Sequence, residues 1–178
     1  PSPLEHLFVG QAMHRDVLTL PAATSVVEGG LMLTRYKTHS ALVLNEEKEL
    51  IGIVTLQDIK RGISNWEKSN AASEQSDISL PLSVVDYPNL EEICAKEVIY
   101  AFEDESLAEA QARMLTRGLR QLPVVDRLDK HHILGLLEQE KIDLACSLEL
   151  TQQMLNPYLP KPVHTPETIP LTVLKQSA

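Results

Sequence analysis

Aromatic and basic residues are both scarce in this chain of 178 residues. Phe, Trp and Tyr together make up 4% of it, which argues against the stacking surfaces that bind single-stranded nucleic acid. Asp and Glu number 25 against 16 Lys and Arg, so the net charge is −9. Because nucleic acids and anionic membranes attract basic surfaces, this balance argues against both as direct partners.

Cysteine and long apolar runs are also rare. Cys94 and Cys146 are the two cysteines, and they do not form a CxxC pair. This usage argues against a disulfide framework or a zinc site and favours a cytosolic setting. The longest membrane-span candidate, residues 17–27, is interrupted by Pro21. No signal peptide is recognisable, and the chain opens on Pro1 rather than on a methionine, as a piece of a longer protein would.

Motifs for catalysis are missing too. The sequence contains no P-loop, no GxGxxG and no GxSxG. Its six histidines are scattered, without a carboxylate or cysteine at metal-ligand spacing. We therefore predict neither an enzyme nor a metal site.

The most informative feature present is an internal repeat. The stretch GIVTLQDI at residues 52–59 returns as GLLEQEKI at residues 135–142. The segments before residue 46 recur 81 residues later, so that residue 17 corresponds to residue 98. The offset is 83 residues at the glycines, where Gly52 corresponds to Gly135. A two-residue insertion is therefore expected in the turn at residues 127–132. The matching segments are 17–19 with 98–100, 25–28 with 106–109, and 43–45 with 124–126.

Each copy has the pattern β-α-β-β-α. Ser25 and Ser106 each precede a glutamate by three residues, which predicts two helix N-caps, and Gly118 predicts a helix end. Two such sheets, each covered by helices on one face, bury their uncovered faces against each other. Strands are expected at 17–19, 41–44 and 50–54, and at 98–100, 122–125 and 133–137, with final helices ending near Ile63 and Leu148.

The organisation that follows is two repeats with connecting segments. We predict the first repeat at residues 9–63 and the second at residues 90–148. Residues 64–89 read as a linker and residues 149–178 as a proline-rich C-terminal tail. Gly29 and Gly30 are expected to let the first repeat's helix pack closely against a neighbour.

These copies resemble a tandem pair of CBS domains, the Bateman module. RQLPVVD at residues 120–126 and GIVTLQDI at residues 52–59 carry the resemblance. It implies an α/β fold of two β-α-β-β-α repeats packed sheet to sheet with pseudo-two-fold symmetry. It also implies a regulatory role in which an adenine nucleotide (ATP, ADP or AMP) binds between the repeats. Whether Mg²⁺ accompanies the nucleotide stays open.

Residues 120–137 and the helix that follows are also similar to the cytosolic C-terminal regulatory domain of prokaryotic ClC-type chloride channels and transporters. That similarity implies a cytoplasmic domain attached to a membrane protein, with the parent's transmembrane domain and a second copy of the chain as partners. The leading hypothesis is a domain that modulates chloride transport. Two alternatives stand beside it: a structural dimerisation module with vestigial pockets, and a regulatory insert of a metabolic enzyme or a magnesium transporter.

Thr55 and Asp58 are the first candidates for nucleotide contact. Their spacing alone favours a capping box at a helix N-terminus. The resemblance instead favours a phosphate held by the Thr55 hydroxyl and the helix N-terminus, and ribose hydroxyls bound by Asp58. It further implies an adenine contact from Val98, Ile99 and Tyr100, a phosphate contact from Arg120, and a wall formed by Gln121 and Leu122.

The opposite cleft departs from this pattern. It would combine Thr19, His39 and Ser40 with Glu138 and Lys141. Glu138 repels a phosphate, and Lys141 cannot accept a hydrogen bond from ribose. Lys141 retains a positive charge that attracts phosphate. We predict that this cleft is empty or binds much more weakly than the cleft with Thr55 and Asp58.

Overall fold

The structure is a computed structural model that describes residues 2–71, 87–160 and 166–168. Parts of the expected linker and tail, residues 72–86, 161–165 and 169–178, lie outside the described residues. The helices are α1 (Pro3–His6), α2 (Val9–Ala12), α3 (Val26–Tyr36), α4 (Leu56–Ala71), α5 (Leu90–Ile93), α6 (Leu107–Arg117), α7 (Gln139–Leu155) and the 3₁₀ turn η2 (Asn156–Tyr158). The strands are β1 (Thr19–Pro21), β2 (Ser40–Leu44), β3 (Leu50–Thr55), β4 (Gln121–Val125) and β5 (Ile133–Glu138).

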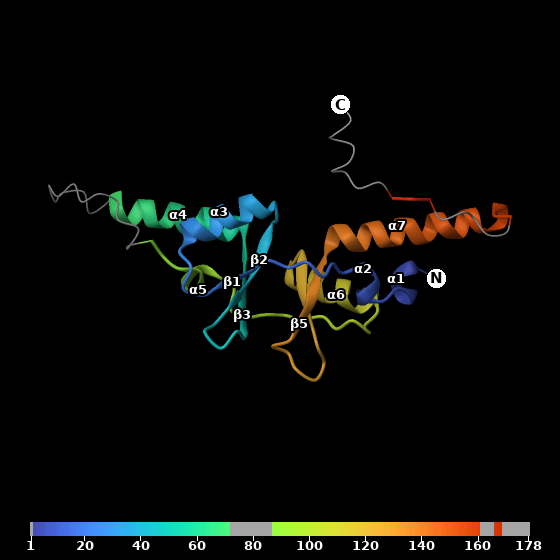
Figure 1. The fold of residues 1–178 in the computed structure, drawn as a ribbon, viewed down its shortest axis with the longest axis horizontal. Helices are drawn as coiled ribbons and strands as arrows, with labels where there is room; N and C mark the ends of the chain where they lie inside the picture. The colour runs from blue at the N-terminus through green and yellow to red at the C-terminus, as the bar shows by residue number, and fades with distance from the viewer. Residues whose placement is uncertain (1, 72–86, 161–165, 169–178) are drawn as a thin grey trace, which may run out of the picture.

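The two repeats form a mixed α/β fold, as expected, in which two sheets meet at the centre (Figure 1). In the first repeat β1 is parallel to β2, which is antiparallel to β3; in the second, β4 is antiparallel to β5. One cluster of buried side chains joins the sheets, with Leu42 and Leu50 from the first repeat and Val125 and Leu136 from the second. Each repeat therefore covers the apolar sheet face of the other.

The short helices exchange places between the repeats. Leu7 and Val9, at the N-terminus, are buried in the core of the second repeat, while Leu90 and Cys94 are buried in the core of the first. Figure 1 shows α1 and α2 beside α7, and α5 beside α3 and α4. The same hydrogen bonds anchor both: the Val9 amide donates to Glu105 O (2.9 Å), as the Leu90 amide does to Thr24 O (2.8 Å). The sequence did not predict this exchange.

The two repeated glycines lie where the exchanged segments cross the sheets. His14 pairs with Leu136 next to Gly135, and Ala95 pairs with Ile53 next to Gly52, each through two backbone hydrogen bonds. A Cβ on Gly135 would lie 2.5 Å from the His14 carbonyl oxygen, and one on Gly52 would lie 2.8 Å from that of Ala95. The glycines are shared by the copies because only a residue without a side chain lets these backbones approach.

Replacement of Gly135 with alanine is therefore expected to destabilise the protein. A Cβ 2.5 Å from a backbone oxygen cannot be relieved by a side-chain rotation, and overpacking of this kind costs roughly 1–3 kcal/mol. Chemical denaturation of the variant measures the loss. Gly10→Ala is the matched control, since its Cβ would meet nothing closer than 3.4 Å, and its unfolding free energy should stay within about 0.5 kcal/mol of the parent. Equal losses in the two variants would contradict this account.

Most of the predicted helix signals are confirmed. The Ser25 and Ser106 hydroxyls accept hydrogen bonds from the amides of Glu28 and Glu109, at 3.2 and 3.1 Å. Gly118 ends α6 in the left-handed conformation, with φ 63°. Gly29 packs against Leu90, to which a Cβ would come within 2.8 Å, so its predicted role in close packing is confirmed as well.

The first strand of each copy differs from the prediction. β1 covers Thr19–Pro21 rather than 17–19. Its counterpart, predicted at Val98–Tyr100, is not a strand; one bridge, Ala101 with Val124, takes its place. The reason lies in the neighbouring strand, because Pro123 occupies the position of Leu42 and has no amide hydrogen to donate.

The final helix of each repeat is longer than expected. α4 continues to Ala71 rather than ending near Ile63, and α7 to Leu155 rather than near Leu148. Both extensions are polar or exposed, so hydrophobic periodicity did not reveal them. The start of the expected linker and the start of the expected tail are therefore helical. Among the described residues, no helix combines the length and apolarity needed to cross a membrane.

Candidate functional site

Thr55 and Asp58 form a capping box at the start of α4. The Thr55 amide and hydroxyl both donate to Asp58 Oδ2, each at 2.9 Å, and the Asp58 amide donates to Thr55 Oγ1 at 3.2 Å. The other carboxylate oxygen, Oδ1, lies 3.7 Å from Nη2 of the exposed Arg61. An ionised carboxylate has about four acceptor positions, so Oδ1 can still accept from a ligand hydroxyl. The Thr55 hydroxyl, by contrast, would have to break its hydrogen bond to Asp58 Oδ2 before it could donate to a phosphate.

The exchanged segment brings part of the second repeat to this junction. Ile53, two residues before Thr55, pairs with Ala95 and packs in the central cluster with Val98 and Tyr100. Cys94 also lies close: burial raises the pKa of its thiol, and the negative charge of Asp58 adds to that rise. The β3–α4 junction thus adjoins the segment that was predicted to contact adenine.

Arg120 and Gln121 lie at the start of β4. Arg120 Nη2 donates to Glu140 Oε1 at 2.9 Å, and both side chains are largely exposed. That hydrogen bond holds the pKa of Glu140 below its usual range, and the charge of nearby His39 contributes to the same shift. Because solvent screens an exposed ion pair, Arg120 can exchange Glu140 for a phosphate at little cost. Within the described residues, no hydrogen bond or ion pair joins Arg120 or Gln121 to Thr55 or Asp58.

Two predicted contacts are restricted by burial. Leu122 has no exposed surface and packs in the core of the second repeat, so its side chain cannot serve as a cleft wall in this conformation. Ile99 packs against the same core and is partly buried. At these two positions a ligand would meet the backbone and, at Ile99, the exposed part of the side chain.

The opposite junction is built differently. Glu138 caps α7 without a side-chain hydrogen bond to the helix, and its Oε1 lies 2.5 Å from His14 Nε2. His14 Nδ1 lies 3.2 Å from the Asp16 carbonyl oxygen, so both ring nitrogens face oxygen acceptors, and a doubly protonated ring can donate to both. Ala95 occupies the position equivalent to His14 in the other copy. The difference between His14 and Ala95 is visible in the sequence. His14 reaches Glu138, however, because the N-terminal segment packs on the second repeat, which the sequence did not predict.

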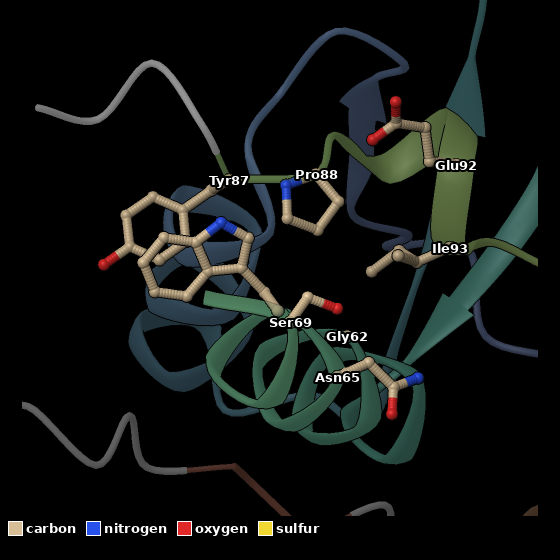
Figure 2. Close-up of a pocket in the computed structure, with 8 residues that line it drawn as sticks. Gly62, Asn65, Ser69, Tyr87, Pro88, Glu92 and Ile93 are labelled. Atoms are coloured by element: carbon tan, nitrogen blue, oxygen red, sulfur yellow. The ribbon is translucent and has the colours of Figure 1, made fainter. Parts of the chain in front are cut away.

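A separate cavity of about 530 Å³ lies between α4 and the segment that leads into α5 (Figure 2). Trp66 and Tyr87 line it with their ring centroids 4.2 Å apart. Pro88 and Ile93 face α4 across it. None of the residues predicted to contact nucleotide lines it. Among the described residues, no cluster of histidine, cysteine and carboxylate side chains suits a metal ion.

Comparison with known families identifies the repeats. The model of the CBS domain matches residues 9–65 and again residues 90–145, more than half of the chain. This chain belongs to the CBS domain family. A CBS pair is a regulatory domain rather than a catalytic one, in agreement with the absence of catalytic motifs from the sequence.

Solved structures of CBS pairs share the fold. The CBS domain pair of protein MJ0100, in complex with 5-methylthioadenosine and S-adenosyl-L-methionine, has a TM-score of 0.63 and 21% identity over 80% of this chain and 98% of that one. CBSX2 in complex with AMP has a TM-score of 0.62 and 20% identity, covering 81% of this chain and 98% of that one. At these identities the likeness establishes the fold alone.

Curated relatives belong to different kinds of protein. A homoserine O-acetyltransferase of Methanohalobium evestigatum is 29% identical over 78% of this CBS pair and 24% of the enzyme. The chloride channel protein CLC-f of Arabidopsis thaliana is 28% identical over 78% of this chain and 18% of the channel. The chain thus spans about a quarter or less of these two relatives, and they do not agree on a parent protein.

Proposed function

We propose that this CBS pair is a regulatory module that binds one adenine nucleotide per chain, in the cleft with Thr55 and Asp58. The observation that carries the proposal is the difference between the two junctions. At the first, Asp58 Oδ1 retains acceptor capacity and the equivalent of His14 is the small Ala95. At the second, the position of Thr55 is taken by Glu138, whose Oε1 is in contact with His14 Nε2. Related CBS pairs solved with AMP and with S-adenosyl-L-methionine support an adenine-containing ligand.

The roles within the cleft follow from the chemistry of the side chains. Asp58 accepts hydrogen bonds from the ribose hydroxyls, and the α4 N-terminus and Arg120 face the phosphates. Val98, Ile99 and Tyr100 surround the adenine, and Gln121 and the backbone of Leu122 complete the wall. Bound nucleotide then regulates the parent by its differential affinity for two arrangements of the repeats.

For the parent we propose a ClC-type chloride channel or transporter, with this module on the cytoplasmic side of its transmembrane domain. The similarity to the channel protein CLC-f supports this choice. The acetyltransferase relatives favour the second candidate, a regulatory segment of a metabolic enzyme. The sequence of the full-length gene distinguishes the two: helices of a chloride channel before Pro1 support the first, and an acyltransferase domain supports the second.

We also propose that two chains associate through α7. Among the described residues, seven of the twelve exposed large hydrophobic side chains lie on α7 and just after it. From residue 144 to residue 159 the sole charge is Glu149, so two copies of a chain with net charge −9 can meet here without strong repulsion. The exposed residues are Leu144, Leu148, Leu150, Met154, Leu155, Tyr158 and Leu159.

Placing two glutamates on this surface is expected to convert a dimer to a monomer. Leu148→Glu/Leu155→Glu adds charge to both sides of a self-complementary interface, where like charges cost several kcal/mol. Sedimentation velocity measures the outcome. Leu128→Glu, in a turn where the side chain is 97% exposed, is the matched control and should remain dimeric. A monomeric parent chain, or a double variant that still dimerises, would refute the interface.

Thermal unfolding tests the nucleotide proposal in the intact module. A ligand that binds the folded chain at about 100 times its Kd stabilises it by about 2.7 kcal/mol. ATP, ADP or AMP should therefore raise the unfolding temperature, whereas ribose 5-phosphate alone should raise it less. If no adenine nucleotide shifts the transition, the vestigial-pocket alternative replaces the proposal.

A further inference from the structure

The second repeat lacks a hydrogen bond that the first repeat has at the edge of its sheet. In the first repeat the Leu42 amide donates to Leu18 O at 2.9 Å, and β1 pairs with β2 at three successive positions. In the second repeat Pro123 replaces Leu42, so the corresponding bond to Ile99 O cannot form. What remains is the single bridge of Ala101 with Val124. The segment at Val98–Tyr100 therefore needs another support.

An ion pair provides that support. Arg113 Nη1, on α6, donates to the Tyr100 carbonyl oxygen at 2.5 Å and to Glu105 Oε1 at 3.2 Å, while Nη2 donates to Glu105 Oε2. The Glu105 side chain is 5% exposed and also accepts from the Phe102 amide at 2.9 Å. The Arg113 side chain is 35% exposed, so the buried partner of this charge-assisted, bidentate pair is Glu105.

The first repeat manages without this pair. Thr24 stands at the position of Glu105 and Met32 at that of Arg113. Pro21 stands at the position of Phe102. Because proline has no amide hydrogen, the first repeat has no counterpart of the Phe102 amide that donates to Glu105. One backbone hydrogen bond at these positions is shared by the repeats, since the Thr24 amide donates to Pro21 O (3.0 Å) as the Glu105 amide does to Phe102 O (3.2 Å). The fold of a repeat thus does not require the ion pair.

We propose that Arg113 and Glu105 are positioning residues that fix the Tyr100 backbone as one wall of the Thr55–Asp58 cleft. Val98, Tyr100 and Ile53 pack against the same central cluster, and Ile53, two residues before Thr55, pairs with Ala95 at the start of the same segment. The ion pair supports the segment beside the cleft that we expect to bind nucleotide, whereas β1, which pairs with β2 at three positions, belongs to the cleft that we expect not to bind. This inference rests on the proposed function, and its test separates the two.

The first half of the test needs no nucleotide. Glu105→Gln/Arg113→Met removes both charges and keeps an acceptor for the Phe102 amide. In the ligand-free variant, hydrogen exchange at the Ala101 and Phe102 amides should become about tenfold faster. Glu97→Gln/Arg117→Met removes an exposed pair that joins the end of α6 to the residue before Val98, and it should leave these amides unchanged. A general stability defect would instead speed exchange throughout the second repeat, and that result, like no change at all, would overturn the positioning role.

The second half measures adenine-nucleotide affinity for the same variants by calorimetric titration. Glu105→Gln/Arg113→Met should bind about tenfold more weakly, with the control pair unchanged. Faster local exchange with unaltered affinity would overturn the role in the cleft. If the parent chain binds no nucleotide, the proposed function fails, while the exchange data still decide whether the ion pair holds the segment. Should the double variant not fold, Arg113→Lys, which keeps the charge but loses the bidentate geometry, is tested in its place.

Discussion

Asp58→Ala is expected to weaken adenine-nucleotide binding by one to two decades. A hydrogen bond to a charged group is worth roughly 1.5–3 kcal/mol, and each decade of affinity corresponds to about 1.4 kcal/mol. Asp58 is suited to this role because its Oδ2 accepts from Thr55, whereas the ion-pair partner of Oδ1, Arg61 Nη2, is 3.7 Å away. Calorimetric titration with ATP, ADP and AMP measures the change.

The capping box complicates this variant, because Asp58 also stabilises α4. Loss of a cap costs about 1 kcal/mol of unfolding free energy, so stability must be measured beside affinity. Lys141→Ala, at the equivalent position of the other junction, is the matched control and should leave the affinity unchanged. Equal affinities of the parent and Asp58→Ala would remove Asp58 from the site. An equal loss of affinity in Lys141→Ala would indicate that the nucleotide binds in the cleft with Glu138 and Lys141 instead.

Rebuilding the second junction is expected to create a second nucleotide site. The triple change His14→Ala/Glu138→Thr/Lys141→Asp gives this junction the three residues of the first, Ala95, Thr55 and Asp58. It removes the Glu138 carboxylate that would repel phosphate, together with its contact to His14, and it restores an acceptor for ribose. The stoichiometry measured by calorimetry should rise from one nucleotide per chain to two.

The separate changes show which feature blocks the second junction. His14→Ala alone leaves the Glu138 carboxylate unpaired and should still give one nucleotide per chain. Glu138→Thr/Lys141→Asp keeps His14, and this junction then differs from the first by an imidazole ring in place of the methyl group of Ala95. A triple variant that still binds one nucleotide would mean that the cleft is closed by something other than these three side chains.

The repeat accounts for most of what could be predicted. A constant offset with a two-residue insertion predicted equivalent strands, caps and turns, and the backbone bonds of Asn45 with Glu49 and of Asp126 with His132 place the insertion in the expected turn. The different polar residues of the two junctions are also visible in the sequence, but their spacing indicates a capping box, and the resemblance to CBS pairs is what selects Thr55 and Asp58 as site residues.

What escaped prediction depended on contacts between distant segments. The exchange of short helices gives no periodic signal, so the contact of His14 with Glu138 could not be inferred although their residue types suit an ion pair. Val98–Tyr100 is predicted as a strand because it repeats residues 17–19, and that prediction takes no account of Pro123, which has no amide hydrogen for the neighbouring strand. The resemblance to CBS pairs implied that Leu122 forms part of the cleft wall, but its side chain packs in the core of the second repeat.

The central claim is that one of the two junctions binds an adenine nucleotide and the other does not. Calorimetric titration of the parent chain with ATP, ADP and AMP tests it most directly. We expect saturable binding of at least one of these nucleotides with a stoichiometry of one per chain. Two nucleotides per chain would show that Glu138 and Lys141 do not disable their cleft, and the absence of heat and of competition for all three would show that neither junction binds nucleotide.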